Sequence, residues 1–114
     1  MEKSSIEKKE IAKANQVFCQ LLAEIRTVAE WAVKMGYKDS KLFSLHYRRM
    51  FKKNPKKAMV ELRLEKAKKL LLEKKHVKNF DVAQKVGLSD EIALYQYFIR
   101  HEGKSPSDIK DSKK

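Results

Sequence analysis

Positively charged and hydroxyl side chains gather in one stretch of the chain, residues 34–57. Nine Lys or Arg residues lie there against a single acidic residue, Asp39, which gives a local charge of +8. Ammonium and guanidinium groups donate hydrogen bonds to phosphate oxygens, and hydroxyl groups can also reach the polar edges of bases. The stretch therefore has the chemistry of a surface that binds a polyanion, although a charged face can also serve solubility alone.

A helix predicted from residue 39 or 40 to about residue 53 would place these groups on one face. Its expected buried face consists of residues at i, i+4, i+7 and i+8, namely Phe43, Tyr47, Met50 and Phe51. The opposite face carries Lys41, Ser44, Leu45, Arg48 and Lys52. A helix with a small, donor-rich face fits a DNA major groove about 12 Å wide. We therefore expect base contacts from Lys41 and Ser44, and phosphate contacts from Arg48, Arg49, Lys52 and Lys53. Lys38, just before this helix, and Arg100, further along the chain, are also expected to contact phosphates.

The pattern of this stretch returns 51 residues further along the chain without a gap. Four pairs show the register: Gly36 with Gly87, Asp39 with Asp90, Tyr47 with Phe98, and Pro55 with Pro106. A repeat of this length is one supersecondary unit used twice. Each copy consists of a predicted helix, a glycine turn and a second helix, so we expect two helix-turn-helix units.

The second copy keeps the pattern and changes its chemistry. The positions that match Lys41, Ser44, Leu45 and Arg48 are Ile92, Tyr95, Gln96 and Ile99, and residues 77–110 carry five basic and five acidic groups. The largely apolar face could contact thymine methyl groups, with Gln96 reading an adenine. It could equally dock onto another protein, or be buried against the N-terminal helix or another protomer.

The remaining elements follow from apolar spacing and capping residues, and they predict an all-α fold of about seven helices. We expect an N-terminal helix in residues 1–26, a first helix-turn-helix in 27–54, a linker helix in 55–76, a second helix-turn-helix in 77–110 and a disordered tail in 111–114. The N-terminal stripe of Ile11, Ala14, Phe18, Leu21 and Ile25 is expected to pack against the first repeat. Thr27 with Glu30 forms a capping-box pattern, and Asn79 is expected to cap the second unit.

The composition limits the classes of protein to which the chain can belong. The 114 residues include 27 Lys or Arg against 15 Asp or Glu, for a formal charge of +12. A single cysteine, Cys19, fits a reducing cytoplasm, and no apolar run is long enough to span a membrane. The three histidines lie far apart without metal-ligand spacing, and Cys19 is expected to be a small core residue. We therefore expect no enzyme activity, no metal and no cofactor.

Three blocks of the sequence resemble the DNA-binding domain of AraC/XylS-type bacterial transcription regulators. The first block runs from Trp31 to Tyr37 and continues through Phe43, Tyr47 and Pro55. The second is Arg63-Leu64-Glu65-Lys66-Ala67 with Leu70-Leu71, which is similar to the linker helix of that family. The third runs from Val82 to Asp90 and continues through Phe98 to Gly103-Lys104-Ser105-Pro106. Together the blocks cover about residues 27–110.

The resemblance implies a seven-helix fold in which the second helix of each unit enters the major groove. It assigns base reading to Ser40, Lys41, Ser44 and Leu45 in the first unit, and to Glu91, Ile92, Tyr95 and Gln96 in the second. Some positions depart from the family pattern. Lys52 replaces a usual glycine, Ala58 an aromatic residue, Leu45 and Gln96 frequent arginines, and Ile99 a customary lysine.

These observations predict a sequence-specific regulator of transcription that binds double-stranded DNA as a monomer. A linker helix of about 20 residues is roughly 30 Å long, close to the 34 Å of one turn of B-DNA, so one chain is expected to enter two successive major grooves. The alternative is a helical interaction module that binds RNA polymerase or another regulator through Ile92, Tyr95 and Ile99. In that case DNA binding would be weak or non-specific.

Overall fold

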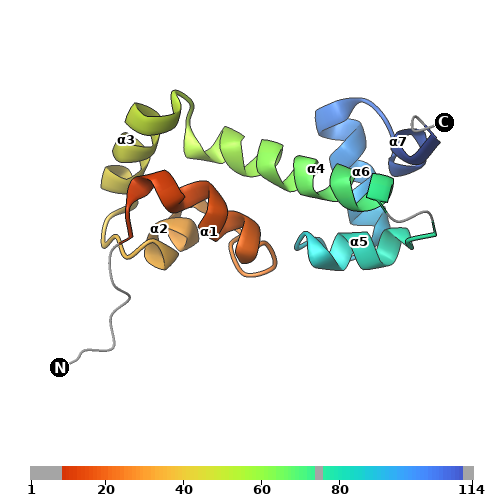
Figure 1. The fold of residues 1–114 in the computed structure, drawn as a ribbon, viewed down its shortest axis with the longest axis horizontal. Coiled ribbons are helices and arrows are strands. Elements are labelled where there is room, and N and C mark those ends of the chain that lie inside the picture. Colours follow the sequence, from red (N-terminus) through yellow and green to blue (C-terminus); the bar gives the residue numbers. More distant parts are fainter. Residues whose placement is uncertain (1–8, 74–75, 112–114) are drawn as a thin grey trace. The chain divides into compact units, whose positions relative to one another are not determined.

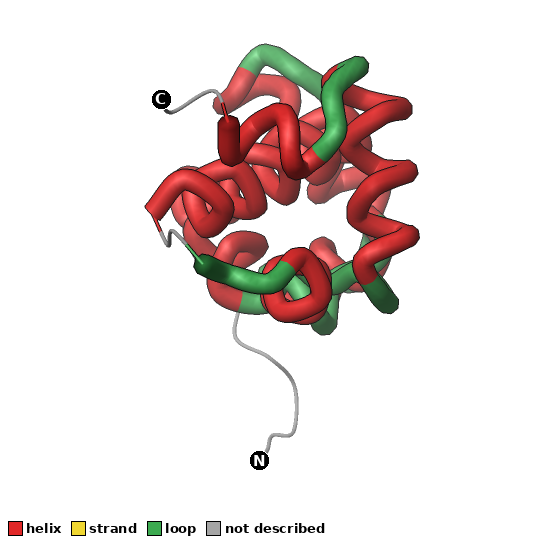
Figure 2. Tube along the Cα trace, turned by 90° about the vertical axis from the view of Figure 1, so that its right-hand side faces the viewer, coloured by secondary structure: helices red, strands yellow, loops and turns green. Residues whose placement is uncertain are grey.

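The computed structural model describes residues 9–73 and 76–111, and within these ranges every regular element is a helix (Figures 1 and 2). A short 3₁₀ turn at Ile11–Lys13 leads into the first α-helix. The helices are α1 (Ala14–Gln20), α2 (Val28–Lys34), α3 (Ser40–Phe51), α4 (Pro55–Glu73), α5 (Asn79–Lys85), α6 (Glu91–Glu102) and α7 (Pro106–Asp111). The predicted all-α fold is confirmed. No helix among the described residues has the length and apolar character needed to cross a bilayer.

The helix boundaries reproduce the sequence repeat. Helices α2 and α5 each have 7 residues, and α3 and α6 each have 12. Each boundary in the first copy lies 51 residues before its counterpart, and the two prolines begin α4 and α7. The structure therefore contains two helix-turn-helix units, α2–α3 and α5–α6, as the sequence predicted.

The turns of the two units have the same backbone conformation. Gly36 has a φ of 84° and Gly87 a φ of 85°, in the left-handed region that favours glycine. In the first turn, the Tyr37 N–H donates to the Ala32 carbonyl over 2.9 Å; in the second, the Leu88 N–H donates to Ala83 over 2.8 Å. These are the bonds of a Schellman motif, which ends a helix and reverses the chain.

Side-chain caps fix where most of these helices begin. Thr27 and Glu30 form the predicted capping box, and the Asp39 and Asp90 carboxylates accept from backbone N–H groups of α3 and α6. The cap predicted at Asn79 is wrong, because α5 already begins at that residue. The Asn79 Oδ1 atom is buried without a hydrogen-bond partner.

The chain divides into two compact units, Met1–Met59 and Val60–Lys114, with the boundary inside α4. The core of unit 1 is aromatic and centres on Trp31, which is fully buried. Its ring lies 4.9 Å from Phe18, 5.2 Å from Phe43 and 5.1 Å from Tyr47, measured between ring centroids. The indole N–H donates to the Ala14 carbonyl over 3.0 Å. The N-terminal stripe therefore packs on the first repeat, as expected.

The N-terminal helix is shorter than the sequence predicted, since α1 ends at Gln20. Leu22 and Ile25 are buried from the loop that follows. The Glu30 carboxylate accepts from the N–H groups of Arg26 and Thr27, and Thr27 is extended just before α2 begins. Residues 1–8 of the expected helix lie outside the described residues.

Unit 2 has a mainly aliphatic core built from α4, α5 and α6. Its buried side chains include Leu64, Ala67, Leu71, Val82, Ala83, Val86, Leu94 and Phe98. On α4, Leu64 is buried, whereas Leu62 is only partly covered. Helix α7 includes Asp111, which the sequence assigned to the tail, and residues 112–114 lie outside the described ranges.

The helices α3 and α6 both end in a left-handed residue, but only one of these residues is glycine. Gly103 has a φ of 73°, whereas Lys52 has a φ of 63° and its N–H donates to the Arg48 carbonyl. A residue with a Cβ atom loses about 1–2 kcal/mol in this conformation.

We expect Lys52→Gly to stabilise unit 1 by about 0.5–1 kcal/mol, because relief of that strain exceeds the extra entropy of glycine in the unfolded chain. Chemical denaturation followed by the fluorescence of Trp31, the single tryptophan, measures the effect. The control is Lys53→Gly, because Lys53 does not have a positive φ. Equal effects of the two changes would contradict the prediction.

Candidate nucleic-acid interface

Helix α3 presents one buried and one exposed face. Phe43 and Tyr47 are buried against Trp31, which fixes the rotation of the helix in unit 1. The Tyr47 hydroxyl donates to Asn15 Oδ1 of α1 over 2.6 Å and ties the helix further to the core. The prediction that Met50 shares this buried face is wrong: Met50 is 48% exposed and lines an open hollow.

The outer face of α3 carries the side chains predicted to read bases. Lys41 and Leu45 are exposed, and Ser40 and Ser44 are partly exposed at the first two turns. Arg48 follows on the same face, since positions 41, 44, 45 and 48 recur at helical spacing. Unit 1 therefore presents two hydroxyl groups, an ammonium group and a guanidinium group along one helix.

Further basic side chains border that face at both ends of α3. Lys38 precedes the helix, and Arg49, Lys52 and Lys53 lie at or just after its last turn; all four are exposed. Arg48 and Arg49 in the last turn also interact favourably with the C-terminal end of the helix dipole. The structure thus places the predicted phosphate-binding residues of unit 1 around the predicted base-reading face.

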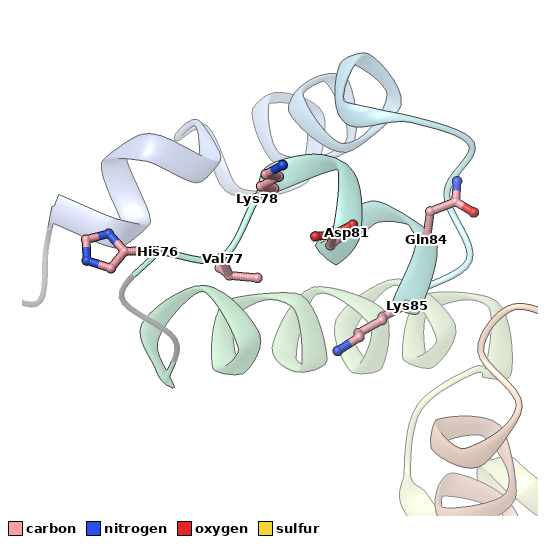
Figure 3. Close-up of a pocket in the computed structure, with 6 residues that line it drawn as sticks. All are labelled: His76, Val77, Lys78, Asp81, Gln84 and Lys85. Atoms are coloured by element: carbon pink, nitrogen blue, oxygen red, sulfur yellow. The ribbon is translucent and has the colours of Figure 1, made fainter.

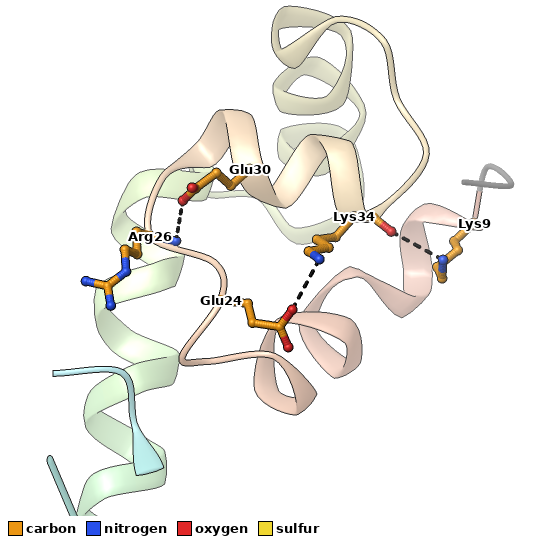
Figure 4. Close-up of polar contacts among 5 residues, drawn as sticks. All are labelled: Lys9, Glu24, Arg26, Glu30 and Lys34. Carbon is orange, nitrogen blue, oxygen red and sulfur yellow. Dashed lines mark hydrogen bonds and ion pairs between the residues drawn. The ribbon is translucent and has the colours of Figure 1, made fainter. Parts of the chain in front are cut away.

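Lys34 belongs to the same basic stretch but has partners within unit 1 (Figure 4). Its Nζ lies 3.3 Å from the Glu24 carboxylate, and its carbonyl accepts from Lys9 Nζ over 3.2 Å. Both bonds connect α2 with the segments around α1. Lys34 therefore joins α2 to the N-terminal region, and the charge that it adds to the basic stretch is partly neutralised.

The outer face of α6 is mostly apolar. Ile92 is 63% exposed, Tyr95 52% and Ile99 42%, at the spacing i, i+3 and i+7. Glu91 and Gln96 are exposed beside them, and Arg100 is exposed near the end of the helix. Leu94 and Phe98 bury the opposite face. The described residues of unit 2 therefore leave the outer face uncovered, and it is open to contact with DNA or with another protein.

A buried arginine holds the turn of the second helix-turn-helix. Arg63 of α4 is the only charged side chain buried among the described residues, and its Nε donates to the Val86 carbonyl over 2.7 Å. Val86 caps the C-terminal end of α5, next to Gly87. Charge-assisted bonds of this kind are about twice as strong as neutral ones. Arg63 therefore positions the turn from which α6 begins.

We expect Arg63→Met to destabilise unit 2 by about 2–3 kcal/mol, because the Val86 carbonyl loses a charged donor inside the protein. Hydrogen exchange of the α5 and α6 amides measures the loss. Arg100→Met is the control, since Arg100 is exposed in the same unit. Unchanged exchange in α5 would contradict the role of Arg63.

Tyr37 and His46 form a second contact that the sequence did not suggest. The Tyr37 hydroxyl lies 2.7 Å from His46 Nδ1, within hydrogen-bond distance, and burial raises the pKa of Tyr37. His46 is partly buried, and this contact joins it to the Tyr37 side chain. Cys19, expected in the core, is exposed, since it lies one residue past the buried stripe of α1.

Unit 2 also has an open hollow of about 590 Å³ beside α5 (Figure 3). The residues that line it are His76, Val77, Lys78, Asp81, Gln84 and Lys85. Its charged side chains are two lysines and one aspartate, and this mixture does not select an anion or a cation. In the part of the chain that the structure describes, no three His, Cys, Asp or Glu residues group as metal ligands would.

Two helix-turn-helix units with exposed second helices define an all-α double helix-turn-helix fold, and solved structures share it. The DNA-binding domain of AdpA, a global transcriptional factor crystallised with a target DNA, has a TM-score of 0.75 at 21% identity, over 92% of this chain and 93% of that one. A DNA-binding transcriptional dual regulator from Escherichia coli K-12 has a TM-score of 0.73 at 15% identity, over 97% of both chains.

A transcriptional regulator with an AraC-type DNA-binding domain, from Chromobacterium violaceum, has a TM-score of 0.73 at 16% identity, over 90% of both chains. The chain therefore has the fold of AraC-type DNA-binding domains, as the sequence resemblance predicted. All three neighbours are regulators of transcription or domains of such regulators. No protein-family model and no curated protein sequence matches the chain.

Proposed function

We propose that the chain is a sequence-specific regulator of transcription that inserts α3 and α6 into successive major grooves of double-stranded DNA. The observation that carries this proposal is the outer face of α3, where Lys41, Ser44 and Arg48 lie exposed or partly exposed on one helix. The shared fold supports it, since the AdpA domain with this fold was crystallised on its target DNA.

In this proposal the exposed side chains of each unit divide between bases and phosphates. The base-reading residues are Ser40, Lys41, Ser44 and Leu45 in unit 1 and Glu91, Ile92, Tyr95 and Gln96 in unit 2. The phosphate contacts come from Lys38, Arg48, Arg49, Lys52, Lys53 and Arg100. Helix α4, with 19 residues, is about 28 Å long, which is close to one turn of DNA and supports binding by a monomer.

The test separates a base contact from a phosphate contact. Binding to random duplexes and to a selected duplex is measured by fluorescence anisotropy across a salt series. We expect Lys41→Ala to relax preference at particular base pairs and leave affinity for random duplexes nearly unchanged. Arg48→Ala is expected to weaken both duplexes alike and reduce the log–log salt slope by about one. If both variants bind like the parent chain, α3 does not contact DNA.

A second candidate function rests on the exposed apolar face of α6. Ile92, Tyr95 and Ile99 have the spacing of a helix face that docks on a partner protein, such as RNA polymerase or another regulator. Tyr95→Ala distinguishes the two functions. Loss of partner binding with unchanged DNA affinity would support the interaction module, whereas altered base preference would support the DNA reader.

A further inference from the structure

We propose that α6 reads a block of A·T base pairs by burying thymine methyl groups against Ile92, Tyr95 and Ile99. This inference rests on the proposed function and specifies the sequence that unit 2 recognises. Gln96, exposed beside the three apolar residues, completes the face by pairing with an adenine. Unit 2 would then supply sequence selectivity, and unit 1 most of the electrostatic affinity.

The three apolar side chains on the outer face of α6 are exposed to solvent. Ile92, Tyr95 and Ile99 are 63%, 52% and 42% exposed, and their spacing of i, i+3 and i+7 places them along one face. Leu94 and Phe98 are fully buried, so the rotation of α6 is set by its core side. The buried side therefore keeps Ile92, Tyr95 and Ile99 on the outer face.

Each base pair displays its own set of chemical groups in the major groove. The thymine C5 methyl group is the one apolar group that the four base pairs display there. Adenine shows an acceptor at N7 and a donor at N6, which a glutamine side chain can pair with in a bidentate manner. A helix face with three apolar residues and Gln96 therefore complements thymine and adenine, and offers little to guanine O6 or N7.

The segment that contains the second helix-turn-helix, residues 77–110, has no net formal charge. Residues 77–110 hold five basic and five acidic residues, against a local charge of +8 in residues 34–57. Neutralisation of phosphates sets the salt dependence of DNA binding. The contribution of α6 should therefore depend little on salt, because it comes from base contacts with few phosphates neutralised. Arg100, exposed near the end of α6, remains for one phosphate.

The experiment removes only the methyl groups. A duplex selected from a random library of about 30 base pairs is compared with duplexes in which deoxyuridine replaces thymine in one block at a time. We expect the affinity for DNA to fall about fourfold for each thymine methyl group that α6 buries, and the log–log salt slope to stay unchanged. The same replacement in the block read by α3 is expected to change affinity less.

Variants of the exposed face assign the effect to α6. Ile92→Ala and Ile99→Ala should each lose part of the discrimination between thymine and deoxyuridine, and both remain folded because both residues are exposed. Val33→Ala is the matched control, since Val33 is 55% exposed in unit 1. It should discriminate as the parent chain does.

The outcomes separate this inference from the function on which it rests. A selected duplex that is bound tightly but is insensitive to deoxyuridine, or a second block rich in G·C pairs, overturns the inference and leaves the proposed function standing. The inference is also overturned if Ile92→Ala and Ile99→Ala both discriminate between thymine and deoxyuridine as fully as the parent chain does. Failure to enrich any sequence overturns the proposed function, and the inference with it.

Discussion

Replacing four basic residues at the end of α3 by glutamine is expected to weaken duplex binding about a thousandfold near 0.15 M salt. The residues are Arg48, Arg49, Lys52 and Lys53, and each is exposed. Each phosphate contact contributes about 0.9 to the log–log salt slope, so four contacts contribute about 3.6. The electrostatic contribution to binding vanishes at about 1 M salt. From there to about 0.15 M salt, a slope of about 3.6 corresponds to a loss of affinity of about a thousandfold. Anisotropy titrations from 0.05 to about 0.5 M salt measure both quantities.

A control of equal charge separates direct contacts from the long-range field of the protein. Replacing Lys69, Lys78, Lys85 and Lys104 removes the same charge from exposed positions of unit 2. The control is expected to reduce the slope by less than one unit, because these four lysines lie outside the basic stretch of residues 34–57. Equal losses in the two variants would mean that net charge, and not the face of α3, determines binding.

Trp31→Ala is expected to destabilise unit 1 by about 3–5 kcal/mol, the cost of removing a large aromatic side chain from a core. The indole is fully buried, contacts three other rings and donates a hydrogen bond to the Ala14 carbonyl. The stability of a small domain is only about 5–15 kcal/mol. The change should therefore leave α3 poorly ordered and reduce DNA binding along with stability.

Urea denaturation followed by far-ultraviolet circular dichroism measures this loss, since the variant lacks the only tryptophan. Trp31→Phe keeps a ring but removes the donor to Ala14, and it should cost about 1–3 kcal/mol. Val33→Ala, at an exposed position of the same helix, should change stability by less than about 0.5 kcal/mol. A loss below about 1 kcal/mol for Trp31→Ala would contradict the aromatic core described for unit 1.

Much of the fold could be predicted because its signals are local and occur twice. The glycine turns need a positive φ, and the Asp39 and Asp90 caps mark the starts of α3 and α6. The match between the two copies, at an offset of 51 residues, then supports each boundary from its counterpart. The residues on the outer faces of α3 and α6 follow from the same register, because one buried face determines the opposite face.

Features that depend on tertiary contacts could not be predicted in this way. Helix α1 ends at Gln20, and a turn follows in which the Glu24 and Ile25 N–H groups donate to the Leu21 carbonyl. Met50 follows the helical spacing of a core residue, yet it lines a hollow where the core of unit 1 ends. The bond between Tyr37 and His46 joins two residues that belong to no common sequence pattern.

Arg63 is a residue that sequence reasoning missed although a signal existed. It lies four residues after Met59 and four before Ala67, so helical spacing places it on the buried stripe of α4. A charged residue at such a position needs a partner inside the protein. The Val86 carbonyl is that partner, but its place in the turn after α5 emerges only in the folded chain.

Selection from a random duplex library of about 30 base pairs, near physiological salt, tests the central claim most directly. Reading by both α3 and α6 predicts a motif in two blocks with centres about one helical turn, or 10 base pairs, apart. A single short block would contradict the role of one of the two helices. No enriched motif, with binding that depends on salt alone, would contradict the claim that this chain reads DNA sequence.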